Sequence, residues 1–196
     1  RMSSKGYGEL GSLAQEAAER RVDEDGLVTL DSFTTTLGTA GTTGISGTVS
    51  TAVSRIQGNA TEPGNGPYHS VNHPFVVKDL QDEFSAPLGT YPIGDGATAE
   101  VIRGGFGLAG QFPALYQTKV WGAGNLAIDA NDDATGGVYA EGSIVLVRGA
   151  SATSVAVRNE KRGGGGSDMI YREQYVYGIR NQNWGFSWVA DSLAPT

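Results

Sequence analysis

The sequence PYHSVNHP at residues 67–74 predicts a short buried strand that passes directly into a helix. Residues 68–71 suit the strand. Asn72 is expected to cap the helix, and Pro74 falls in the first helical turn, where its missing N–H costs nothing. The helix carries an apolar stripe made of Val76, Val77, Leu80 and Phe84. We expect it to end at residues 87–89, where a proline and a glycine occur.

Two further helices are predicted upstream of this stretch. The first has apolar residues at helical spacing, and Gly26 stands where its C-terminus would stop. Its apolar residues are Leu10, Leu13, Ala14, Ala17, Ala18 and Val22. The second helix ends at Gly58, and its apolar residues are Ile45, Val49, Ala52, Val53 and Ile56. Residues 59–67 are polar and turn-rich, which predicts a loop.

From residue 97 onward the sequence favours strands. The predicted strands cover residues 100–103, 115–121, 126–129, 143–148, 154–160 and 184–190. Because helices come first and strands later, the pattern predicts an α+β fold rather than a parallel α/β fold. The run GGGGS at residues 163–167 indicates either a flexible hairpin tip or an inserted linker.

Composition excludes several classes of protein. The 196 residues allow one substantial domain or two small ones. The net charge of −7 argues against a nucleic-acid-binding protein, which needs Lys and Arg to displace counterions from phosphate. Without cysteine there are no disulfides and no thiolate chemistry. No apolar run approaches the ~20 residues that span a bilayer, so we expect no membrane contact.

A glycine-rich motif, GFGLAG at residues 105–110, matches the dinucleotide fingerprint G-x-G-x-x-G. That fingerprint holds a pyrophosphate only where its third glycine opens a helix. Pro113 and a strand-like run follow here. A glycine-rich turn between strands is therefore the better interpretation.

The run DANDD at residues 129–133 places oxygen ligands at alternate positions, as a calcium loop begins. However, Ala134 stands where such a loop has glycine, and Ala140 stands where it has glutamate. A solvated acidic turn is favoured over a calcium site. His69 and His73 are four residues apart, but Pro74 separates a strand from a helix there, so we expect no metal site at the histidines either.

No constellation of residues indicates an enzyme. There is no G-x-S-x-G elbow, and two histidines leave few candidate bases. Asp79, Asp82 and Glu83 lie on one predicted helix face, where carboxylates more often favour solubility than acid–base catalysis. Most aromatic residues are expected to fill the core. We therefore expect no catalysis and no cofactor.

The PYHSVNHP segment belongs to a set of motifs that follow one another in order. FTTTLG at residues 33–38 precedes it, and YVYGIR at 175–180, NWGF at 183–186 and VAD at 189–191 follow it. Together they resemble the C-terminal two-thirds of the major capsid protein of tailed double-stranded DNA bacteriophages, which has the Hong Kong 97 fold. The most specific parts are GPY at 66–68 with the following His-Pro, and VYG at 176–178.

This resemblance implies a wedge-shaped α+β fold with a long spine helix, a peripheral domain sheet and an axial domain. It places the end of the spine helix and the first part of the peripheral domain in residues 1–72, the axial domain in 73–150, and strands returning to the peripheral domain in 151–196. The N-terminal arm and the extended hairpin of such proteins would precede Arg1. We therefore expect either a fragment or processed product of a longer protein, or an expressed segment with trimmed ends.

The resemblance also implies a function. The chain is expected to be a structural coat subunit, not an enzyme, that self-assembles into hexamers and pentamers of an icosahedral shell around phage DNA. Its partners would be other copies of itself, and scaffolding, portal or decoration proteins. It would enclose DNA without reading its sequence. Assembly would take place in the host cytoplasm, and the final location would be the virion capsid.

The polar, turn-rich residues 122–137 are expected to form the loop near the capsomer axis. The residues assigned to self-assembly are Gly122, Asn125, Asp129, Asn131, Asp132 and Asp133. Two alternatives stay open. A β-rich phage tail or carbohydrate-binding module would also explain the glycine, threonine and tryptophan content, and a gene-transfer particle or nanocompartment would use the same shell fold. A hydrolase with an unrecognised site is the weakest alternative.

Overall fold

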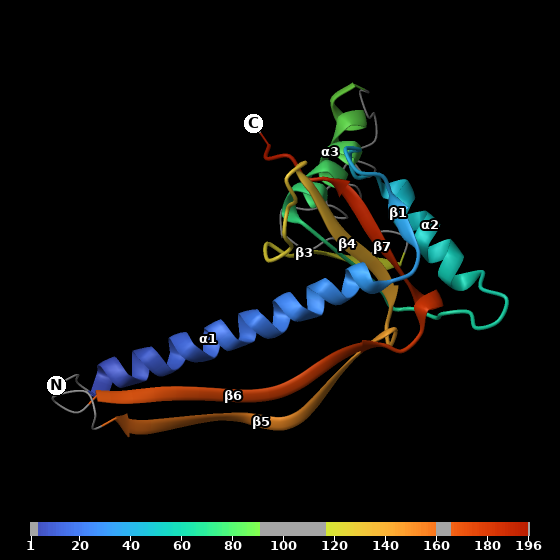
Figure 1. Cartoon of the computed structure of the whole chain (residues 1–196). Helices are drawn as coiled ribbons and strands as arrows, with labels where there is room; N and C mark the ends of the chain where they lie inside the picture. Colours follow the sequence, from blue (N-terminus) through green and yellow to red (C-terminus); the bar gives the residue numbers. More distant parts are fainter. Residues whose placement is uncertain (1–3, 91–116, 160–165, 196) are drawn as a thin grey trace. The chain divides into compact units, whose positions relative to one another are not determined.

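The computed structural model describes residues 4–90, 117–159 and 166–195, whose helices and strands are drawn in Figure 1. The chain divides into two compact units. The helix–hairpin unit consists of Arg1–Gly26 and Leu146–Gly178, and the sheet unit consists of Leu27–Val145 and Ile179–Thr196. This division falls at other positions than the boundaries after residues 72 and 150 that the family resemblance implied.

The helix–hairpin unit combines one long helix with a two-stranded sheet. The helix is α1 (Ser4–Val28), and the paired strands are β5 (Ile144–Asn159) and β6 (Gly166–Ile179). Each of these three elements has one end within the residues of the sheet unit. The two strands predicted at 143–148 and 154–160 are one continuous strand, β5. Of the GGGGS run, residues 163–165 lie outside the described residues, and the rest begins β6.

Helix α1 does not stop at Gly26, so that prediction is wrong. The backbone stays helical to Val28 and then tightens into the 3-10 turn η1 (Thr29–Ser32). Gly26 instead allows a close approach to β6, because a Cβ at this position would lie 2.9 Å from the Tyr177 ring. The predicted apolar stripe is also not one buried face: Val22 is buried, whereas Leu13 is 60% exposed.

The sheet unit is built on a mixed five-stranded sheet in the order β1-β7-β4-β2-β3. Its strands are β1 (Thr36–Gly38), β2 (Tyr68–Asn72), β3 (Thr118–Gly122), β4 (Asp133–Ala140) and β7 (Gly185–Asp191), the last preceded by the 3-10 turn η2 (Gln182–Trp184). Strand β4 pairs antiparallel with β2 and β7, whereas β2–β3 and β1–β7 are parallel pairs. The prediction of a mixed α+β fold is confirmed.

The strand predictions in this unit are partly right. Strands β2, β3 and β7 fall at or beside the predicted ranges. Residues 126–129 form no strand, only an isolated bridge between Ile128 and Ala134, and residues 100–103 lie outside the described residues. The sequence pattern did not indicate β4, because Gly136 and Gly137 are typical of a turn.

Helices α2 (Ser46–Gln57) and α3 (Pro74–Thr90) share an apolar core with one face of the sheet. This core contains Val49, Ala52, Val53 and Ile56 from α2, Val76 and Leu80 from α3, and Tyr68, Val120, Val138, Ala140, Phe186, Trp188 and Ala190 from the strands. The predicted apolar face of α2 is confirmed except for Ile45, which precedes the helix and is 52% exposed, and that of α3 is confirmed for Val76, Val77 and Leu80. Helix α3 continues past the end predicted at residues 87–89 to Thr90, the last described residue of this segment.

The opposite face of the sheet carries a second, smaller core. Its buried residues are Leu27, Leu30, Phe33 and Leu126, against which Val71 and Tyr139 pack. Because side chains alternate along a strand, Tyr68 and Val71 of β2 contribute to opposite cores. The sheet is thus apolar on both faces.

The start of α3 differs from the predicted cap. Asn72 is still part of β2, pairing with Gly122, and its buried amide donates to Ser70 Oγ at 2.8 Å. His73 takes the position before the helix, where its Nδ1 accepts the Phe75 N–H at 3.3 Å. The strand ladder therefore extends one residue further than predicted and displaces the cap by one position.

Glu83 of α3 caps the N-terminus of α2. The N-cap residue of α2 is Ile45, whose side chain makes no capping hydrogen bond. Instead the Glu83 carboxylate accepts the Ser46 N–H at 2.7 Å and the Ser46 Oγ–H at 2.9 Å. A carboxylate at a helix N-terminus is also stabilised by the helix dipole. Glu83 therefore fixes α2 to α3 rather than serving solubility alone, as its predicted position on the exposed face had suggested.

Gly136 sets how closely β4 approaches β2. A Cβ at this position would lie 2.3 Å from the Val71 carbonyl oxygen and 2.4 Å from Asn72 Oδ1. The first of these atoms is backbone in the middle of the paired strands, so it cannot move aside as the end of a flexible side chain could. The glycine is therefore required by packing and not by a turn.

We expect Gly136→Ala to destabilise the protein by about 3 kcal/mol or more, because the methyl group overpacks a site closed by backbone. The matched control is Gly124→Ala, where a Cβ would meet nothing within 4 Å. Urea unfolding curves of the two variants measure the difference. Equal stabilities would contradict the packing role of Gly136.

We expect Glu83→Ala to lower the free energy of unfolding by about 1 kcal/mol, the usual cost of losing a helix cap. The control is Asp82→Ala, which removes a carboxylate paired with Lys78 on the exposed surface of the same helix. Exposed pairs contribute little, so this variant should change stability by less than about 0.5 kcal/mol. Thermal unfolding followed by circular dichroism tests the contrast.

Candidate functional site

The six residues predicted for self-assembly all fall at or between β3 and β4. Gly122 ends β3, and Asp133 begins β4. Asn125, Asp129, Asn131 and Asp132 lie in the connection between them, which covers residues 123–132. The predicted loop 122–137 is therefore too long, because its last five residues form part of a central strand.

Asp129 organises the turn that leads into β4. Its Oδ1 accepts the N–H groups of Asn131 at 2.7 Å and Asp133 at 3.0 Å, and its own N–H donates to the Asp133 carbonyl at 2.8 Å. The hydrogen bond from the Asp133 N–H, followed by that from Asn131, lowers the pKa of the Asp129 carboxyl, because both favour the charged form. The carboxylate is thus occupied within the turn.

Asp132 adopts a left-handed backbone conformation with φ of 63°. Aspartate tolerates this region better than most residues. Its carbonyl accepts the Ser192 N–H at 2.6 Å. The turn is therefore held to the end of β7 and presents Ala130, Asn131 and the Asp132 side chain to solvent.

Asp133 differs from the rest of the predicted set because it is only 6% exposed. One carboxylate oxygen, Oδ1, accepts the Gly41 N–H at 2.6 Å, which holds the connection between β1 and α2. This aspartate has a structural role inside the sheet unit. The surface that remains for contacts is the exposed part of residues 123–132.

The acidic turn gives no support to a calcium site. Among residues 4–90, 117–159 and 166–195, no group of three or more His, Asp or Glu side chains is placed to hold a metal ion. The GFGLAG motif at 105–110 lies outside the described residues. No described helix combines the length and the apolar character needed to cross a membrane.

The two histidines serve separate packing roles. His69 accepts the Trp121 Nε1–H at 3.4 Å and lies 5.8 Å from the Tyr139 ring, whereas His73 is buried at the start of α3. Burial lowers the pKa of both imidazoles, and Lys119 lowers that of His69 further. Both rings are therefore favoured in the neutral form, as their acceptor roles require.

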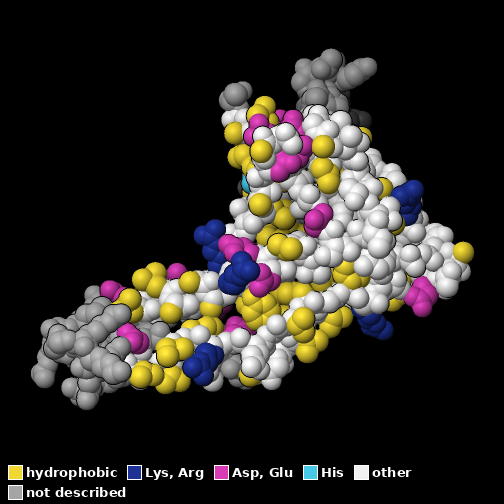
Figure 2. All heavy atoms as spheres, viewed as in Figure 1, with side chains coloured by type: hydrophobic (Ala, Val, Ile, Leu, Met, Phe, Trp, Pro, Cys, Tyr) yellow, Lys and Arg dark blue, Asp and Glu magenta, His cyan; other side chains and the backbone are white. Residues whose placement is uncertain are grey.

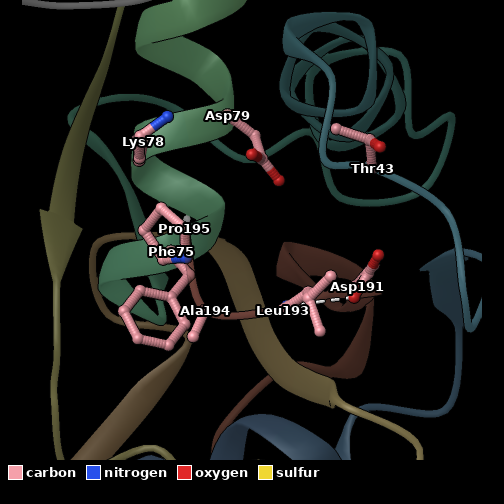
Figure 3. A pocket seen from close by; sticks show the side chains of 8 residues that line it. All are labelled: Thr43, Phe75, Lys78, Asp79, Asp191, Leu193, Ala194 and Pro195. Atoms are coloured by element: carbon pink, nitrogen blue, oxygen red, sulfur yellow. Dashed lines mark hydrogen bonds between the residues drawn. The ribbon is translucent and has the colours of Figure 1, made fainter.

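A pocket of about 290 Å³ lies between the start of α3 and the C-terminal residues (Figure 3). It is lined by Thr43, Phe75, Lys78, Asp79, Asp191, Leu193, Ala194 and Pro195. Burial raises the pKa of Asp79, with smaller contributions from Asp82 and Asp191, while Lys78 and the Gly44 N–H oppose the rise. None of the described residues that line the pocket is a Ser, Cys or His.

Comparison with known proteins places this architecture among phage structures. No family model matches the chain. A search of curated proteins found no significant match. A structure from Mycobacterium phage Che8 matches 95% of this chain with a TM-score of 0.66 and 17% identity. The head structure of Helicobacter pylori bacteriophage KHP40 matches 94% of it with a TM-score of 0.53 and 12% identity.

The chain spans 63% of the Che8 chain and 67% of the KHP40 chain. At these identities the likeness is one of fold. It extends over both units of the chain, including the long helix, the hairpin and the five-stranded sheet. The chain therefore has a fold found in phage head structures, and the resemblance indicated by its sequence motifs is confirmed at that level.

Proposed function

We propose that the protein is a structural subunit of a phage head, which assembles with further copies of itself into the shell that encloses the phage DNA. The observation that carries this proposal is the match of 95% of the chain to a phage structure at a TM-score of 0.66. Matches of this extent involve the order and pairing of all the main elements, not one motif. The role would be structural, with no reaction catalysed.

Within this proposal the helix–hairpin unit corresponds to the peripheral domain, because that domain consists of a spine helix and a sheet in the family that the sequence resembles. The sheet unit corresponds to the axial domain. This assignment replaces the boundaries expected from sequence, since residues 27–72 share their cores with β4 and β7. The 123–132 connection would then lie near the centre of hexamers and pentamers.

The chemistry of the chain is compatible with a container. A net charge of −7 gives no general attraction to DNA phosphates, so the subunit would enclose DNA without sequence-specific contacts. Scaffolding, portal or decoration proteins would be its further partners, first in the host cytoplasm and finally in the virion.

We expect the complete gene, when expressed, to yield uniform round shells in the particle fraction, visible by negative-stain electron microscopy. Shells would then be tested for nucleic acid, which separates a phage head from a protein-filled compartment. A chain that stays monomeric at high concentration, and whose tryptophan fluorescence responds to glycans, would instead support the carbohydrate-binding alternative.

We expect Ala130→Arg to block closed capsomers, because symmetry would bring one added arginine per subunit to the same axis, where like charges repel. Ala130 is exposed in a turn held by Asp129, so the side chain can change without loss of the fold. Ala130→Ser is the matched control at the same position. Electron microscopy and sedimentation of both variants make the comparison, and normal shells from Ala130→Arg would disprove the axial placement.

A further inference from the structure

The β5–β6 hairpin exposes a row of branched apolar side chains. The exposed residues are Val145, Leu146, Val147, Val155 and Val157 on β5, and Ile170 and Val176 on β6. Figure 2 shows hydrophobic side chains along these strands, in contrast to the mixed surface around them. A soluble surface rarely gathers so many large apolar groups on one element without a partner.

All of these side chains except Leu146 lie on one face of the two-stranded sheet. A Cβ at Gly149 would lie 3.7 Å from the Gln174 Cβ, so these two positions are neighbours across the strands. Because side chains alternate along each strand, odd-numbered residues of β5 share a face with even-numbered residues of β6. Six of the seven exposed residues satisfy this rule, and Leu146 is the exception. We call this face the outer face of the hairpin.

The inner face of the hairpin is the one that contacts α1. Tyr175 on β6 donates its hydroxyl proton to Asp25 at 2.6 Å, and the Tyr177 ring lies against Gly26. Arg148 of β5 pairs with Glu173 of β6 at 3.6 Å. A hydrogen bond and a ring contact thus join the end of the helix to β6 on this face.

The helix–hairpin unit consequently has very little core of its own. Among its described residues, Val22 is the only buried apolar side chain. A hairpin of two strands is marginally stable in water unless further strands or helices cover it. The outer face is therefore where additional apolar burial would stabilise this unit most.

We propose that a second copy of this chain covers the outer face of the hairpin in the assembled state. This inference rests on the proposed function, in which every subunit carries the same face and symmetry must cover each one alike. The charged residues of this face whose exposure is described are Arg172, which is exposed, and Asp168, which is half-buried, so a strongly charged partner finds little to pair with.

The size of the face agrees with a contact between copies. Strand β5 has 16 residues, which at ~3.3 Å per residue gives a length of ~50 Å. Two strands ~10 Å wide then offer ~500 Å² per copy, or ~1,000 Å² for both partners, at the lower limit of specific interfaces. Such a contact is too small for a permanent isolated dimer, but it suffices when symmetry repeats it around a shell.

The absence of cysteine from the chain allows a direct test. Val176→Cys places a single thiol on the outer face, at a position that is 60% exposed in the isolated chain. We expect a maleimide to label this thiol at least tenfold more slowly in shells assembled from this chain alone than in unassembled subunits. Ser54→Cys, exposed on α2, reports whether the reagent reaches the assembled protein, and labelling after denaturation gives the total thiol.

A charge on the same face provides an independent readout. We expect Val176→Asp to reduce shell formation, while unfolding followed by tryptophan fluorescence stays unchanged because Trp121, Trp184 and Trp188 all belong to the sheet unit. Shells whose Val176→Cys thiol reacts at the unassembled rate would overturn this inference and leave the proposed function standing. A product of the complete gene that never assembles would overturn the proposed function, and this inference with it.

Discussion

Strand β4 can lie between β2 and β7 only because position 136 has no side chain. The Gly136 backbone approaches the Val71 carbonyl so closely that a Cβ would overlap it. Once β4 is in place, its two faces supply Val138 and Ala140 to one core and Tyr139 to the other. The start of this strand also fixes two contacts of Asp133. Its N–H donates to Asp129 in the turn before the strand, and its carboxylate accepts the Gly41 N–H in the connection between β1 and α2.

The two units are stabilised in different ways. The sheet unit has apolar cores on both faces of its sheet, whereas the helix–hairpin unit has a hydroxyl–carboxylate hydrogen bond between α1 and β6 and an ion pair between β5 and β6. Hydrophobic burial is the main favourable term in folding, so under our proposal the helix–hairpin unit would gain stability from surfaces of neighbouring subunits. A shell subunit with one self-sufficient part and one part completed by neighbours would couple its own order to assembly.

Several acidic residues that look like surface or ligand groups are used internally. Asp129 accepts two backbone N–H groups, Asp133 holds Gly41, and Glu83 caps α2. Unpaired N–H groups at turns and helix starts need acceptors, and carboxylates are strong ones. These internal roles leave a narrower surface for the proposed assembly contacts than the sequence pattern suggested.

Local patterns determined the buried strand at 68–72, the amphipathic helix on either side of it, and the last strand. They also determined the mixed class of the fold. Burial periodicity and turn residues are short-range signals, which a sequence shows directly. They could not reveal β4, since a glycine needed for strand packing looks the same as one needed for a turn. The continuous β5, the cap supplied by Glu83 and the burial of Asp133 were decided by the tertiary structure alone. Each depends on a partner far away in the sequence, as Asp133 does on Gly41, and such a contact exists only once the chain has folded.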